Sequence, residues 1–96
     1  MAKVKFLPTA DNDYQQSLNW YAAQSERAAD NFENAVAKTI QKIVDNPGMG
    51  QWLDDESRFQ RVPRYPFHIV YWYDSDEVVI KAVAHGSRHP NYWTRQ

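Results

Sequence analysis

The chain has 96 residues, of which 43% are hydrophobic, 15% aromatic and 24% charged. This length predicts one small domain over residues 1–96, because it supports a single hydrophobic core. With three Gly and five Pro, the composition excludes a low-complexity or disordered chain. The absence of cysteine excludes disulfides, thiol chemistry and thiolate zinc sites. No apolar run approaches the roughly 20 residues of a membrane helix, and no signal peptide is recognisable, so we expect a cytoplasmic protein with no membrane partner.

The charges are unevenly distributed along the chain, although the formal net charge is only −1. Residues 1–56 carry five Lys or Arg against nine Asp or Glu, a net charge of −4. Residues 57–96 carry six against three, a net charge of +3, and those three acids all lie within residues 74–77. This segregation indicates either an anionic partner for one face or a solvated face with Arg stems lying over aromatic rings.

The first 24 residues have the pattern of a strand followed by a helix. Residues 3–7 alternate polar and apolar side chains, which is typical of a short half-buried strand. Thr9 is predicted to cap the helix, with Asp11 and Asp13 placed near the positive end of its dipole. One apolar face with i, i+4, i+7, i+8 spacing consists of Tyr14, Leu18, Tyr21 and Ala22.

A second, longer helix has the clearest periodicity in the sequence. Ser25 is its predicted cap, and Asn46-Pro47-Gly48 ends it. Because almost no loop separates the two helices, they must form an antiparallel hairpin. Lys38 and Lys42 are predicted to face away from the core, with Asp30 and Glu33. We expect the apolar side chains Phe32, Val36, Ile40 and Ile43 to pack against Ile69, Tyr71 and Ile80.

The second half changes to the two-residue period of strands, predicted over residues 58–62, 67–73 and 78–85. Both faces of residues 67–73 are largely apolar, which favours a central strand. Residues 78, 80, 82 and 84 are predicted to share one face of the last strand. The order predicts an α+β domain with an N-terminal strand, an antiparallel helical hairpin and then a three-stranded antiparallel meander, all forming one sheet.

Few catalytic templates fit this sequence. It has no Gly-rich phosphate loop, and nothing around Ser87 resembles a nucleophile elbow. A metal site would need His85 and His89 with His68 as a third ligand, but Pro90 and the lack of nearby carboxylates disfavour it. We therefore predict neither a metal nor another cofactor.

A group of basic and aromatic residues remains in the second half. Arginines neutralise phosphates, aromatic rings stack on bases, and His or Tyr can move a proton in phosphodiester cleavage. Such a group can bind or cut RNA. In the alternative, Arg61 and Arg64 are ordinary surface residues, Trp72 belongs to the core and the tail aromatics only hold the tail; the residue types leave both interpretations open. The group consists of Arg61, Arg64, Trp72, His85, Arg88, Tyr92, Trp93 and Arg95.

Two segments, residues 64–73 (RYPFHIVYWY) and 78–93 (VVIKAVAHGSRHPNYW), resemble the C-terminal half of the RelE/ParE superfamily. These proteins are the toxin halves of bacterial type II toxin–antitoxin modules. The first half of the chain agrees, and the resemblance spans residues 3–93. It implies the RelE/ParE toxin fold, no cofactor, and a cognate antitoxin (ParD-like or other) that forms a hetero-oligomer with the toxin. The matching positions in the first half are Ala10, Asp11, Tyr21, Ala28, Phe32, Asn46 and Pro47.

The superfamily includes two activities on one fold, so the fold does not choose between them. ParE-like members inhibit DNA gyrase without hydrolytic chemistry, and RelE-like members cleave mRNA in the ribosomal A site. The ending A-V-x-H-x-x-R-x-P-x-Y-W at residues 82–93 resembles the ParE-like members. It implies gyrase as the target, and the residues carried over as target-binding are Arg64, Arg88, Tyr92 and Trp93.

Two further functions stay open beside gyrase inhibition. For a ribosome-dependent mRNA endonuclease, the residues that match a catalytic set are Arg61, His85, Arg88 and Tyr92. Against this activity, residues 54–56 (Asp-Asp-Glu) replace a Lys-rich segment, and an acidic run beside an RNA site repels the backbone. The other alternative is a binding protein of the same fold that has lost its toxicity.

Overall fold

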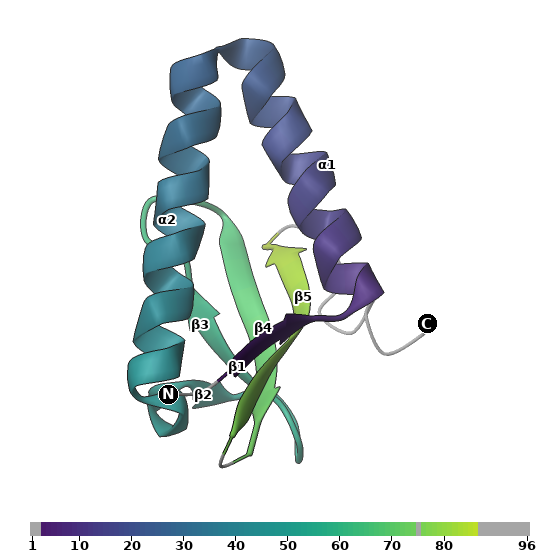
Figure 1. Cartoon of the computed structure of the whole chain (residues 1–96), viewed down its shortest axis with the longest axis vertical. Coiled ribbons are helices and arrows are strands. Elements are labelled where there is room, and N and C mark those ends of the chain that lie inside the picture. The colour runs from purple at the N-terminus through teal and green to yellow at the C-terminus, as the bar shows by residue number, and fades with distance from the viewer. Residues whose placement is uncertain (1–2, 75, 87–96) are drawn as a thin grey trace.

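The computed structural model describes residues 3–74 and 76–86. Two helices form an antiparallel hairpin that covers one face of a sheet (Figure 1). Within the described residues the sheet has five strands in the order β1-β5-β4-β3-β2. Strand β1 is parallel to β5, and the other neighbours are antiparallel. The elements are β1 (Lys3–Phe6), α1 (Pro8–Gln24), α2 (Glu26–Asp45), the short 3₁₀-helix η1 (Pro47–Met49), β2 (Gln51–Trp52), β3 (Arg58–Arg61), β4 (Phe67–Tyr73) and β5 (Glu77–His85).

The predicted α+β class and element order are confirmed, and β4 is the central strand. Strand β2 was not predicted, because a pair of residues is too short to show an alternating pattern. It pairs with the edge of β3 and extends the predicted meander by one strand. Neither helix of the described segments is long and apolar enough to cross a bilayer.

The helical hairpin is closed by a single residue. Ser25 alone separates α1 from α2, and its Oγ accepts a hydrogen bond from the backbone N of Ala28 at 3.0 Å. This is the predicted cap, and it satisfies one of the free N–H groups of the first turn. Helix α2 ends at Asp45, before Asn46 and Pro47, as predicted.

The start of α1 differs from the prediction that Thr9 caps it. The helix begins at Pro8. Proline lacks a backbone N–H, but an N–H in the first turn would have no partner within the helix, so nothing is lost there. Thr9 therefore lies inside the helix, and its hydroxyl donates to the carbonyl oxygen of Lys81 at 3.0 Å. Asp13 is buried and accepts a hydrogen bond from the backbone N of Val83 at 3.2 Å. Both side chains thus attach α1 to β5.

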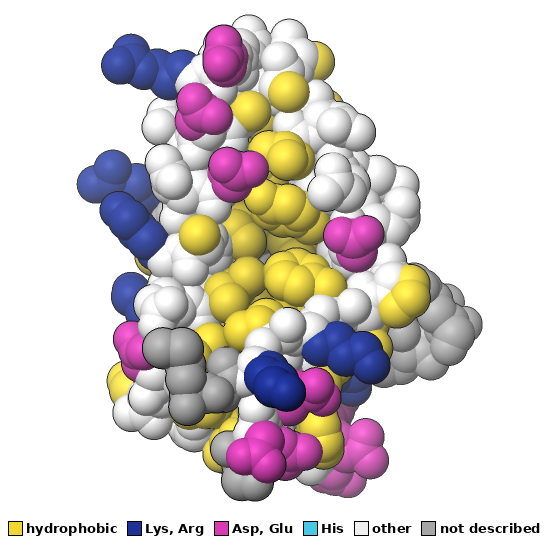
Figure 2. All heavy atoms as spheres, viewed as in Figure 1, with side chains coloured by type: hydrophobic (Ala, Val, Ile, Leu, Met, Phe, Trp, Pro, Cys, Tyr) yellow, Lys and Arg dark blue, Asp and Glu magenta, His cyan; other side chains and the backbone are white. Residues whose placement is uncertain are grey.

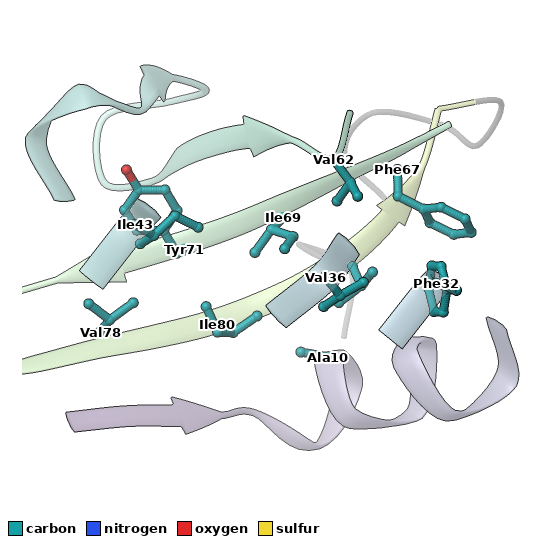
Figure 3. Close-up of a cluster of buried hydrophobic side chains, with 11 residues drawn as sticks. Ala10, Phe32, Val36, Ile43, Val62, Phe67, Ile69, Tyr71, Val78 and Ile80 are labelled. Atoms are coloured by element: carbon teal, nitrogen blue, oxygen red, sulfur yellow. The ribbon is translucent and has the colours of Figure 1, made fainter. Parts of the chain in front are cut away.

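The hydrophobic core fills the space between the hairpin and the sheet (Figure 3). Phe32, Val36 and Ile43 of α2 are buried in one cluster with the strand residues that were predicted to face them. Ile40 packs against the same cluster but is only partly buried. The predicted orientation of α2 is therefore confirmed. On α1, the predicted apolar face is also partly buried, except that Ala22 is exposed.

A β-bulge changes the alternation of side chains along β5. Val70 pairs with Ala82 and Tyr71 pairs with Ile80, which leaves Lys81 as an extra residue. Val83 consequently belongs to the core beside the helices, whereas Ala82 joins a second buried cluster. The prediction that residues 78, 80, 82 and 84 share a face is wrong, since it assumed an uninterrupted two-residue period.

The second cluster lies on the sheet face opposite the helices. It consists of Val70, Ala82 and Ala84, with Leu53 and Phe59 packed against it. Trp72 also belongs to this outer face, because its neighbours Tyr71 and Tyr73 pack on the helix side. Its side chain is 40% exposed, so Trp72 is not a core residue.

Candidate target-binding surfaces

His85 lies at the end of β5 on the helix side of the sheet. It pairs with Phe67, and the two rings meet edge-on with centroids 5.1 Å apart. His85 lines a cleft of about 510 Å³ between α1 and the ends of β4 and β5. The remaining lining residues are Asp13, Gln16, Ser17, Trp20, Tyr21, Pro66, Phe67 and Val83.

Arg61 lies on the opposite face of the sheet. It pairs with His68, which in turn pairs with Ala84 of the outer cluster. Burial, and then the positive charge of Arg61, lower the pKa of His68 below its ordinary value. The sheet therefore separates Arg61 from His85, and the structure does not bring these two candidate catalytic residues together.

Arg64 occupies the turn between β3 and β4. The backbone N of Tyr65 donates to the carbonyl oxygen of Val62 at 3.2 Å, which places Pro63 and Arg64 at the two central positions of the turn. Arg64 has φ of 71°, the left-handed conformation that the second central position of a type II turn requires. Its exposed side chain lines a groove of about 680 Å³ along α2.

The acidic segment 54–56 forms the turn between β2 and β3 and is exposed. Oδ1 of Asp54 accepts hydrogen bonds from the backbone N of Glu56 at 2.8 Å and of Ser57 at 2.7 Å. The bond from Glu56 is the main reason that the pKa of the Asp54 carboxyl lies below its ordinary value. This turn is therefore anionic at neutral pH, and it repels phosphates.

The predicted group of basic and aromatic residues is divided among different surfaces. Arg61 and Trp72 lie on the outer face of the sheet, His85 lines the α1 cleft, and Arg64 lies beside α2. Within residues 3–74 and 76–86, no three potential metal ligands lie together. The predicted residues Arg88, His89, Tyr92, Trp93 and Arg95 lie outside the described residues.

Sequence reasoning did not include Lys38 and Lys42 among the candidate binding residues. Both line the groove beside Arg64. Their i, i+4 spacing places them on one helix face, a signal that was present in the sequence. Only the packing of α2 against the β3–β4 turn shows that this face meets Arg64.

The helical hairpin over one face of a mixed sheet is the fold of a toxin–antitoxin protein that has already been solved. A chain from the "Chromosomal ParDE TA system from P. aeruginosa" aligns with a TM-score of 0.74 and 18% sequence identity, covering 88% of this chain and 96% of that chain. At this identity the likeness concerns the fold alone. No curated protein sequence matches this chain.

The family itself follows from the sequence model that matches most of the chain. The model for the "ParE toxin of type II toxin-antitoxin system, parDE" matches residues 4–90. The protein belongs to this family and is a ParE-family toxin of a type II toxin–antitoxin system. The resemblance noted from its strand motifs is thereby confirmed.

Proposed function

We propose that this ParE-family toxin inhibits DNA gyrase in the cytoplasm and that a cognate antitoxin neutralises it. Within the described residues, the observation that carries this choice is the separation by the sheet of Arg61 from His85, two of the four residues of the catalytic alternative. Cleavage of a phosphodiester needs a cation and a proton-transfer group at one phosphate. Inhibition by docking has no such requirement, because a binding surface can be distributed over several elements.

The residues proposed to contact the target are Arg64, Arg88, Tyr92 and Trp93. Arg, Tyr and Trp are the residue types that most often dominate protein interfaces. Arg64 is exposed at the second central position of the β3–β4 turn. The acidic turn at residues 54–56 also supports docking over RNA cleavage, since its exposed carboxylates disfavour an RNA backbone nearby.

The proposed antitoxin site is the crevice between the two helices. Hydrophobic side chains are exposed along this crevice (Figure 2). Tyr14, Leu18 and Tyr21 of α1 are only partly buried against the core, so another chain can cover them. An amphipathic antitoxin segment that folds on binding would place apolar side chains here and on the sheet edge. Its acidic groups would meet the Arg-rich half of the toxin.

Purified gyrase with supercoiled plasmid tests the target, in parallel with ribosomes programmed with mRNA. We expect the toxin to trap cleaved DNA–gyrase complexes and to leave the mRNA intact. Arg88→Ala and Trp93→Ala should reduce trapping through lost charge and contact area. His85→Ala should have little effect in comparison, with a folded state verified by circular dichroism.

Two results would contradict the gyrase proposal. Codon-dependent mRNA cuts that disappear in His85→Ala would instead establish a ribosome-dependent endonuclease. No effect on either target, from a folded protein that still binds its antitoxin, would indicate a toxin fold without toxicity.

Co-expression with the product of the adjacent gene tests the antitoxin. We expect the two proteins to co-purify and the partner to restore growth. Leu18→Glu in the crevice should weaken the complex, whereas Gln15→Glu, an identical charge change at an exposed position of α1, should not. A toxin that stays soluble, monodisperse and harmless without any partner would contradict this part of the proposal.

A further inference from the structure

The charged residues that line the groove beside α2 are all positive. Three cations line it, Lys38 and Lys42 from α2 and Arg64 from the β3–β4 turn. The carboxamides of Asn31 and Asn34 lie along the same groove, and none of the acidic residues of α2 lines it. Lys38 and Lys42 are about 6 Å apart along the helix axis, since four residues rise about 1.5 Å each. The groove therefore presents a row of positive charges within a chain of net charge −1.

The backbone at Arg64 shows that this side chain occupies a position better suited to glycine. Its φ of 71° is unfavourable for a residue with a Cβ, and the second central position of a type II turn usually carries Gly or Asn. A long cation at such a strained position gains nothing for the turn itself. Strained positions of this kind concentrate at ligand-binding sites.

The hydrogen-bonding character of the lining selects the ligand chemistry. Lys and Arg side chains have donors and no acceptor, and each Asn carboxamide adds two N–H donors beside its acceptor oxygen. The hydroxyl of Thr39, which also lines the groove, already donates to the carbonyl oxygen of Ala35 at 2.9 Å. A phosphate backbone offers acceptor oxygens only, and Arg, Lys and Asn are all common phosphate contacts. An acidic peptide helix would need apolar anchors as well. Of the apolar residues that line the groove, Ala35 and Tyr65 already pack against the core, and Pro63 belongs to the turn.

The lining also favours a double-stranded ligand over a single-stranded one. Single strands bind to exposed aromatic rings on which successive bases stack. Among the described residues, Tyr65 is the one aromatic that lines the groove. Its ring already packs edge-on against Tyr21 and Phe32, with centroids 5.6 Å and 5.5 Å apart. It therefore offers no free platform for bases.

We propose that this groove binds the phosphate backbone of duplex DNA without reading its sequence, through Lys38, Lys42 and Arg64. In the choice of duplex DNA over duplex RNA, the inference rests on the proposed function, because gyrase holds duplex DNA. The groove would then place the toxin on the DNA beside the enzyme. Binding to DNA alone requires no gyrase, so the two proposals can fail separately.

Fluorescence anisotropy of a labelled duplex of about 20 base pairs, titrated with the full chain at several salt concentrations, tests the inference. Three phosphate contacts predict a slope of log affinity against log salt of about −2.7, or a loss of about 40-fold between 50 and 200 mM salt. Lys38→Gln/Lys42→Gln should reduce the magnitude of the slope by about 1.8. The matched control Lys3→Gln/Arg27→Gln removes the same charge at exposed positions outside the groove and should leave the slope unchanged.

Arg64→Gly separates binding from folding. Gly adopts a positive φ without strain, so the melting temperature should stay the same or rise. The magnitude of the salt slope should fall by the contribution of about one phosphate contact. Arg64→Lys should restore the slope. A loss of binding that follows a loss of folded protein in this series would contradict the proposal.

Three outcomes would overturn the inference. One is a slope that is the same in the groove variant and its control. Another is equal binding of single-stranded DNA or duplex RNA of the same length. The third is a polyglutamate peptide that binds the groove while DNA does not, which would assign the groove to an acidic protein partner. If DNA binding is absent and gyrase is still inhibited, this inference fails and the proposed function stands.

Discussion

The hydroxyl of Tyr71 donates a hydrogen bond to the carbonyl oxygen of Pro47 at 2.5 Å, which connects the central strand of the sheet to the chain leaving α2. Gly50 lies against the same side chain, and a Cβ at this position would be 2.1 Å from the Tyr71 hydroxyl oxygen. Arg58 completes the arrangement, because its Nη1 donates to the carbonyl oxygens of Gly48 and Gly50 at 3.0 Å and 2.8 Å. The loop between α2 and β3 is therefore held to the sheet by side chains from β3 and β4.

Gly50→Ala should lower the free energy of unfolding by about 1–3 kcal/mol, because the new methyl group has to displace the buried Tyr71 ring or move the loop. Tyr71→Phe removes the nearest of the clashing atoms, but two ring carbons would remain 2.8 Å and 2.9 Å from the new Cβ. Gly50→Ala should thus cost less in the Tyr71→Phe background, without becoming neutral. Urea denaturation of the four proteins measures this coupling, and an equal cost in both backgrounds would contradict the assigned contact.

Phe32→Ala should destabilise the fold by about 3–5 kcal/mol. The Phe32 ring is fully buried and contacts four other rings, those of Tyr14, Tyr21, Tyr65 and Phe67, at centroid distances of 4.8 to 5.9 Å. Ile40→Ala, at a partly buried position, should cost less, about 2 kcal/mol. Asn34→Ala at an exposed position of α2 should stay within about 0.5 kcal/mol. Midpoints of chemical denaturation check the order, which would be reversed if α2 were rotated.

Much of this fold could be predicted from side-chain period alone. The 3.6-residue period identified the buried face of α2, and the apolar character of both faces of residues 67–73 identified the central strand. The period failed where a single extra residue interrupts it. Lys81 is that residue in β5, and a bulge is fixed by pairing with β4, which the local sequence does not specify. The prediction that Thr9 caps α1 is wrong for a related reason, since the hydrogen-bond acceptor of its hydroxyl, the carbonyl oxygen of Lys81, is 72 positions away.

Ser25→Ala should cost about 1 kcal/mol of stability, because the Ser25 hydroxyl is the side-chain acceptor for the N–H of Ala28. Ser25→Gly should cost less, since Gly is itself tolerated at helix caps. The neighbouring exposed residue Gln24 provides the control, and Gln24→Ala should be close to neutral. Thermal or urea unfolding measures all three. If Ser25→Ala proved as neutral as Gln24→Ala, the hydrogen bond would contribute nothing to the hairpin.

The candidate binding residues were harder to predict than the fold, for a physical reason. Arg61, Arg64 and His85 lie within 25 positions of one another in the sequence, and their residue types suggested one shared site. Strand alternation and register place Arg61 and His85 on opposite faces, and the turn places Arg64 beside α2. The cations that share a groove with Arg64 are Lys38 and Lys42. They belong to the half of the chain with a net negative charge, so the charge distribution along the sequence did not point to them.

His68 makes stability depend on pH in one direction. Its pKa in the folded state lies below the ordinary 6.5, first because of burial and then because of Arg61. As the pH falls below about 6.5, the unfolded chain binds a proton at this residue before the folded protein does. The contribution of His68 to stability is therefore fully present above about pH 6.5, and it is lost as the pH falls toward the folded-state pKa.

Arg61→Gln removes the smaller of the two causes, so the pKa of His68 should rise part of the way toward its ordinary value, and the loss of stability at acidic pH should shrink. His68→Gln should remove this contribution altogether. NMR titration of the imidazole Cε1–H signals, assigned with His68→Gln, measures the pKa, and urea midpoints between about pH 5 and 8 measure the stability. A pKa of His68 at or above 6.5 in the unmodified protein would show that its ring, edge-on to Phe59 at 5.2 Å, is not desolvated by the outer face of the sheet.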